Sequence, residues 1–85
     1  MPILSRFHGI VVFMNYNDHP PPHFHARHAD HEVVVEIASG IVIGTFPPSA
    51  RRMILNWMIR HKAELLDRWS RARAREPLLP IAPLP

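Results

Sequence analysis

The sequence contains no cysteine, only three glycines and no long apolar run. The lack of cysteine excludes disulfide bonds and zinc sites built on thiolates. Gly9, Gly40 and Gly44 stand too far apart to form a glycine-rich phosphate-binding loop. The apolar runs are far shorter than the roughly 20 residues that span a bilayer, and the first residues lack a signal-peptide pattern. We therefore expect a cytoplasmic protein with no membrane segment.

The chain is also short, at 85 residues, so it should form one small domain with a limited core. Small domains are often stabilised further by a bound metal or an oligomer interface, which makes a homodimer plausible on size alone. Charge is unevenly distributed along the chain. Residues 1–47 carry two arginines and four acidic residues, whereas residues 48–85 carry eight basic and three acidic residues. The two halves should therefore present different surfaces.

The first half carries the pattern of a small antiparallel sheet of about four strands. Runs of β-branched and aromatic residues alternate with turn residues, and Ser39-Gly40 is a hairpin signal. This pattern predicts strands at residues 10–14, 23–28, 32–38 and 41–46.

The second half carries a helical pattern. Pro47-Pro48-Ser49 ends the sheet and favours a helix start. Side chains of one predicted face then recur at steps of three and four residues: Ala50, Ile54, Trp57, His61, Leu65 and Trp69. Met53, Met58 and Leu66 widen this stripe. We expect one long amphipathic helix of about 25 residues, packed against the sheet. The fold class is therefore α+β, with a single domain over residues 1–76. Residues 77–85 form a proline-rich tail, extended and either disordered or packed on a neighbour.

The segment from Asn17 to His31 holds five of the seven histidines. Because alternate residues of a strand share a face, His23 and His25 should point the same way. His19 can return to them across the three prolines at 20–22. Imidazole is the commonest ligand for transition metals, and carboxylates can complete such sites. The segment predicts a metal site of His19, His23 and His25, with Asp18 as a fourth ligand or as a group that orients a ligand.

The predicted ion is a divalent transition metal, with zinc favoured and nickel, iron or manganese still open. An open coordination position would allow hydrolysis, while full protein ligation would make the metal structural. Two other interpretations remain: a solvated polar face, and metal-free acid–base chemistry by His23 or His25. His28 and His31 are weaker candidates. His61 lies on the apolar helix stripe, which favours a packed histidine.

The helix is rich in arginine. Arg51, Arg52, Arg60, Arg68 and Arg71 are candidates for contacts with the phosphates of a nucleic acid. Three acidic residues interrupt the basic series, so a solvated helix face is the favoured interpretation. Trp57 and Trp69 lie on the apolar stripe, where core packing is expected rather than base stacking.

Three segments resemble the bacterial DUF4160 family, a domain of unknown function. They are Ser-Arg-Phe-His-Gly-Ile-Val-Val-Phe-Met at 5–14, Asp-His-Pro-Pro-Pro-His-Phe-His at 18–25, and the helix with Asn56-Trp57 and Glu64-Leu-Leu-Asp-Arg-Trp69. The resemblance implies a small α+β domain and supports His19, His23 and His25 as the site, but it implies no particular activity. His28 and His31 depart from the family pattern.

The resemblance also implies a partner, a small protein encoded by an adjacent gene in a toxin–antitoxin-like pair. Two alternative functions follow: a nucleic-acid- or ribosome-directed component of such a pair, or a non-catalytic interaction subunit.

Overall fold

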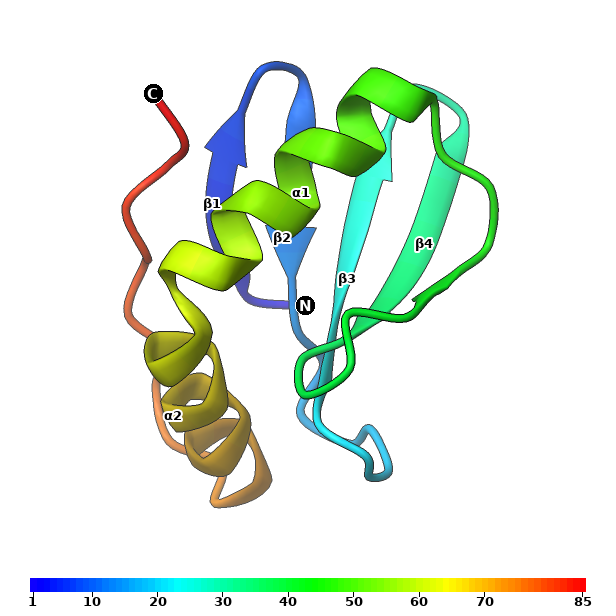
Figure 1. Ribbon diagram of the computed structural model, residues 1–85. Coiled ribbons are helices and arrows are strands. Elements are labelled where there is room, and N and C mark those ends of the chain that lie inside the picture. The colour runs from blue at the N-terminus through cyan, green and yellow to red at the C-terminus, as the bar shows by residue number, and fades with distance from the viewer.

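A computed structural model describes residues 1–85 and shows an antiparallel sheet followed by two helices (Figure 1). The five strands lie in chain order, β1-β2-β3-β4-β5, as a meander. The elements are β1 Ile3–Phe7, β2 Ile10–Phe13, β3 His23–His28, β4 His31–Glu36, β5 Val42–Ile43, α1 Pro48–Arg60 and α2 Lys62–Arg73. The predicted α+β class is confirmed, and β3 has the predicted bounds.

The prediction of about four strands missed β1. Polar Ser5 and Arg6 interrupt the apolar pattern there. The turn that joins β1 to β2 is also unusual in sequence, because His8 and Gly9 both have positive φ, at 50° and 78°. Two consecutive residues with positive φ form the tight turn that suits a twisted hairpin, but His-Gly is not the usual signal for it. The strand predicted at 10–14 is therefore the second strand of the sheet.

The last strand is shorter than predicted. Residues 41–46 were expected to be extended, but only Val42 and Ile43 pair with β4. Gly44 has φ +111°, a conformation that side-chain-bearing residues rarely adopt, and a Cβ there would lie 3.0 Å from the Glu32 carbonyl oxygen. The chain leaves the sheet at this glycine and reaches α1 through Pro47.

The prediction of one long helix was wrong, because the helix breaks at His61. His61 has φ −124° and ψ 24°, and its backbone N–H donates to the carbonyls of Trp57 and Met58. No proline or glycine lies nearby, so local sequence does not account for the break. A straight helix of 25 residues would be about 38 Å long, whereas the longest dimension of the molecule is 33 Å. The break lets α1 cross the sheet and α2 turn toward its other end (Figure 1).

The core lies between the helices and one face of the sheet. Alternate strand residues supply that face, and the predicted helix stripe covers it. Its most buried members include Ile10, Val12, Phe24, Val33, Val35, Ile54, Trp57 and Leu65. Phe24 and Ala26 of β3 are fully buried, while His23 and His25, which alternate with them, are only partly buried. The same alternation that builds the core therefore turns the two histidines away from it.

The tail over residues 77–85 is extended and runs beside β1 (Figure 1). The Ile81 N–H donates to the Leu4 carbonyl at 2.8 Å, and the Ile81 side chain is buried. Trp57 Nε1–H donates to the Ala82 carbonyl at 2.8 Å. The tail thus covers the edge strand β1 and supplies the hydrogen-bond acceptor for the buried indole N–H of Trp57. Neither helix has the length and apolar character needed to cross a bilayer.

Candidate metal centre

The candidate site lies at one end of the sheet, where the loop between β2 and β3 meets α2. Asp18 belongs to that loop, and His23 and His25 are the first and third residues of β3. Strand alternation brings the two imidazoles together, with ring centroids 5.3 Å apart. The predicted pairing of His23 with His25 is therefore observed.

One carboxylate oxygen joins the two rings. Asp18 Oδ2 lies 3.1 Å from His23 Nε2 and 2.8 Å from His25 Nε2. The three atoms lie within 4.8 Å of one another, and the side chains are 14%, 13% and 24% exposed for His23, His25 and Asp18. A tetrahedral zinc with bonds of about 2.0–2.1 Å holds its ligands roughly 3.3 Å apart. The triad is thus close to the spacing that an ion requires and is reachable from solvent.

Aromatic side chains hold both imidazoles in place. The ring of His25 stacks on Phe13, with centroids 5.0 Å apart and an interplanar angle of 12°. The ring of His23 packs against Trp69 of α2 at 4.9 Å. Such contacts restrict ring rotation, so the Nε2 atoms are preorganised toward Asp18.

His23 has a defined second hydrogen bond. Its Nδ1–H donates to the Pro21 carbonyl at 2.8 Å. In a neutral imidazole only one ring nitrogen carries a proton, so Nε2 then presents a lone pair. That lone pair faces Asp18 Oδ2 at 3.1 Å. The Nε2 lone pair and the carboxylate oxygen repel each other at this distance unless a cation lies between or beside them. Either a metal ion or a second proton on His23 meets this requirement.

The second ring nitrogen of His25 differs from that of His23 because it forms no hydrogen bond. Nδ1 is buried and has no hydrogen-bond partner. The nearest carboxylate oxygen is Glu32 Oε2 at 4.0 Å, which is too long for a hydrogen bond. Asn15 Nδ2 lies 3.4 Å from His25 Nε2, a weak contact beside the Asp18 bond. The position of His25 is therefore set mainly by Phe13 and Asp18.

The environment of Asp18 favours its charged form. Burial by itself would raise the pKa of Asp18, but the hydrogen bond from His25 and the charges of His25 and His23 outweigh it, so the pKa lies below its ordinary value. Asp18 is therefore a carboxylate at neutral pH, which is the state that binds a cation.

The comparisons with known proteins agree with the sequence resemblance. A family model described as a domain of unknown function (DUF4160) matches residues 9–70. The chain belongs to the DUF4160 family. No curated protein and no solved structure shows a significant match to it. Within this DUF4160 domain the matched segment includes the whole triad and Trp69.

The other predicted histidines lie outside the triad. His19 is exposed and does not contribute to the group of atoms within 4.8 Å, so its role as a ligand stays a prediction. His28 Nδ1–H donates to the Gly9 carbonyl at 3.1 Å, and His31 is exposed at the β3–β4 turn. His61 is half-buried and bonds Glu64 at 2.7 Å, in keeping with a packed histidine.

The arginine candidates do not form one surface. Arg68 is held by Asp67 and by the tail carbonyls of Leu79 and Pro80, and Arg71 pairs with Asp67 and Glu76. Three others lie exposed on α1: Arg51, Arg52 and Arg60. The one side-chain bond among them runs from Arg60 to the amide oxygen of Asn56. Contacts with nucleic acid, a ribosome-directed role and a neighbouring protein partner all stay predictions.

Sequence reasoning missed the contribution of α2 to the site. Trp69 was assigned to the core stripe, yet its indole, buried as expected, also supports His23. Arg73 Nη1–H donates to the Asp18 backbone carbonyl at 2.9 Å. These residues lie about fifty positions from the loop, and no local pattern links them. The excess of basic residues in the second half and of acidic residues in the first was the one available signal.

Proposed function

We propose that this DUF4160 domain binds a divalent transition metal through Asp18, His23 and His25, with zinc favoured. The locked ring of His23 carries the proposal. Its Nδ1–H is bound to the Pro21 carbonyl, so its Nε2 lone pair converges with Asp18 on one point. Metal-binding histidines typically donate their other N–H to a carbonyl or carboxylate, which fixes the tautomer.

The ligand set restricts the choice of ion. Two imidazoles and one carboxylate, with a position left over, suit catalytic zinc and also non-haem iron, while nickel and manganese remain open. The remaining position decides the role. If water occupies it, the bound metal supplies a nucleophile and Lewis acidity for hydrolysis. If His19 closes over the ion as the fourth ligand, the site is structural.

The protein groups have separate tasks in this proposal. Pro21 holds the proton of His23 on Nδ1, which leaves Nε2 free to bind. Phe13 stacks on the ring of His25, and Trp69 packs against the ring of His23 at an interplanar angle of 50°, so both limit hydration of the imidazoles. Arg73 fixes the loop by its bond to the Asp18 carbonyl, so the carboxylate stays oriented toward the histidines.

Metal analysis of untagged protein tests the proposal. After dialysis against zinc and then metal-free buffer, we expect about one equivalent to remain in the wild type and a loss of most of it in His23→Ala and His25→Ala. His31→Ala is the matched control, because His31 is exposed and outside the triad. Less than about a tenth of an equivalent in the wild type, unchanged by the substitutions, would mean that a proton rather than a metal satisfies His23.

A further inference from the structure

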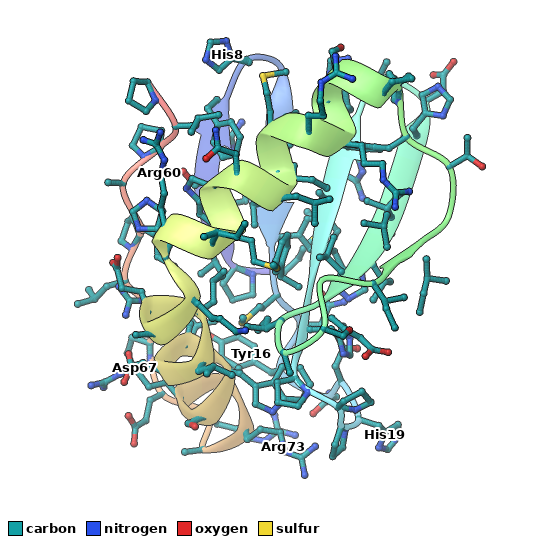
Figure 2. All side chains as sticks on the ribbon, viewed as in Figure 1. His8, Tyr16, His19, Arg60, Asp67 and Arg73 are labelled. Atoms are coloured by element: carbon teal, nitrogen blue, oxygen red, sulfur yellow. The ribbon has the colours of Figure 1, made fainter.

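A cavity of about 260 Å³ adjoins the triad on the side of α2. Six residues line it: Tyr16, Asn17, Asp18, His19, Arg73 and Arg75. Figure 2 shows Tyr16, His19 and Arg73 at the same end of the molecule. Five of the six residues are polar or charged, so the cavity suits a polar ligand rather than an apolar one.

Two arginines of the cavity lack an acidic partner. Arg73 donates to the Asp18 carbonyl at 2.9 Å, and Arg75 Nη2–H donates to Asn17 Oδ1 at 2.6 Å. Both acceptors are neutral, and neither arginine forms an ion pair, in contrast to Arg68 and Arg71. A guanidinium has five N–H donors in a planar fork that matches the oxygens of phosphate. These contacts aim both arginines at the cavity and leave most of their donors for a ligand.

Arg75 occupies a backbone position that favours glycine. It follows α2 with φ 57°, its N–H donates to the Ala72 carbonyl, and the Glu76 N–H donates to the Arg71 carbonyl. This is the Schellman arrangement, in which glycine is the usual residue because it has no Cβ to strain the left-handed conformation. The chain keeps an arginine where glycine would be more stable, and that arginine lines the cavity.

The charge balance of the cavity favours an anion. Two guanidinium groups outweigh the partial negative charge of the α2 carboxyl end, which is about half a unit and is already bonded by the Schellman N–H groups. The Asp18 carboxylate contacts His23 and His25, at 3.1 and 2.8 Å, and forms an ion pair with neither arginine of the cavity. A bound divalent ion would raise the local potential further.

We propose that this cavity binds the phosphate group of a small phosphate ester, clamped by Arg73 and Arg75 beside the metal triad. The volume lies just below the roughly 300–1,000 Å³ of drug-sized ligand pockets, which is room enough for the phosphate group of a small monoester. The proposal names the substrate class of the metal site and rests on the proposed function in that respect. Phosphate binding itself needs only the two arginines.

The test is a titration of metal-free, chelator-treated protein with inorganic phosphate and with phenyl phosphate, followed by the amide NMR signals of residues 16–19. We expect saturable shifts with both ligands at millimolar concentration, weakened about tenfold by Arg75→Gly and by Arg73→Gln. Arg75→Gly should fold at least as stably as the wild type, so loss of binding would not reflect unfolding. Arg52→Gln is the matched control, because Arg52 is exposed on α1 and its substitution removes one positive charge, as the two test substitutions do.

Three results would overturn the proposal: no saturable shift at about 10 mM of either ligand, an equal effect of Arg52→Gln, or binding of inorganic phosphate without the ester. The metal analysis is independent of these measurements. If metal binding fails and the arginine-dependent shifts remain, the proposed function falls and the ester site stands. If metal binds and the shifts are absent, the proposed function stands and the phosphate-ester site falls.

Discussion

The two imidazoles of the candidate site differ in what holds their Nδ1 atoms. His23 donates to Pro21, while His25 has a buried Nδ1 with no partner. Residue alternation along β3 was enough to predict that the two rings share a face, because the period of a strand is two. The place of His19 could not be predicted in the same way, because a loop with three prolines has no repeating geometry. Trp69 and Arg73 belong to the distant helix α2 and Arg75 follows its end, so no local pattern links them to the loop.

At Arg75 the backbone itself yields a prediction. Arg75→Gly should raise the free energy of unfolding by about 0.5–1 kcal/mol, because relief of the left-handed strain exceeds the entropy that glycine adds to the unfolded chain. Urea denaturation followed by circular dichroism measures the change. Ala74→Gly is the control, since Ala74 has φ −85° and should be destabilised by glycine. Equal destabilisation of both variants would contradict this assignment.

The helices show where element-level prediction succeeds and where it stops. The apolar stripe from Ala50 to Trp69 was predicted from helical spacing, and most of its apolar members are buried, whereas Met53 is partly buried and Leu66 is 39% exposed. The break at His61 was not predicted, because helix propensity is adequate on both sides of it and no proline or glycine marks it. Similarly, β1 was missed because its turn lacks the usual residues. The break matters for function, since it brings Trp69 and Arg73 to the site.

Acidic and basic residues along α2 make its stability depend on pH. The hydrogen bond from Arg71 is the largest influence on Asp67 and, with Arg68, it outweighs burial, so the pKa of Asp67 is lowered from 3.8. A lowered pKa means that the carboxylate stabilises the folded state above pH 3.8 and that this contribution is lost as pH falls through the folded-state value. Asp67→Asn should therefore lower the melting temperature at pH 7, by a few degrees at most for an exposed pair.

The effect of the same substitution on the melting temperature should shrink as pH falls below 3.8 and through the lowered pKa of Asp67, because the carboxylate becomes protonated in both states. Asp30→Asn is the matched control, because Asp30 is a loop aspartate without an ion pair. A difference that persists undiminished at pH 2 would show that Asp67 acts through packing rather than charge.

Across the whole molecule, the last residues help to close the fold. The side chain of Ile81 is 3% exposed and that of Leu79 is 68% exposed, although both belong to the proline-rich tail. Ile81→Ala should lower the free energy of unfolding by about 2–4 kcal/mol, since it opens a cavity beside β1, whereas Leu79→Ala should change it by less than about 0.5 kcal/mol. Chemical denaturation measures both. Equal small effects would mean that the tail is a separate appendage to the domain over residues 1–76.

The acidic first half and the basic second half of the chain meet at the candidate site. The acidic first half supplies Asp18 and the basic second half supplies Arg73 and Arg75, and the two meet where the loop after β2 contacts the end of α2. Composition alone indicated two different surfaces. It could not indicate that they join at one site, because that depends on the break at His61 and on the order of the strands.

The central claim is that Asp18, His23 and His25 hold a metal, and X-ray absorption spectroscopy of the zinc-loaded, untagged protein tests it most directly. We predict scattering from at least two imidazoles around the zinc, at bonds of about 2.0–2.1 Å, with one imidazole lost in His25→Ala and none lost in His31→Ala. A third imidazole in the wild type would add His19 to the ligands. A spectrum without imidazole scattering, or one unchanged by His25→Ala, would contradict the claim.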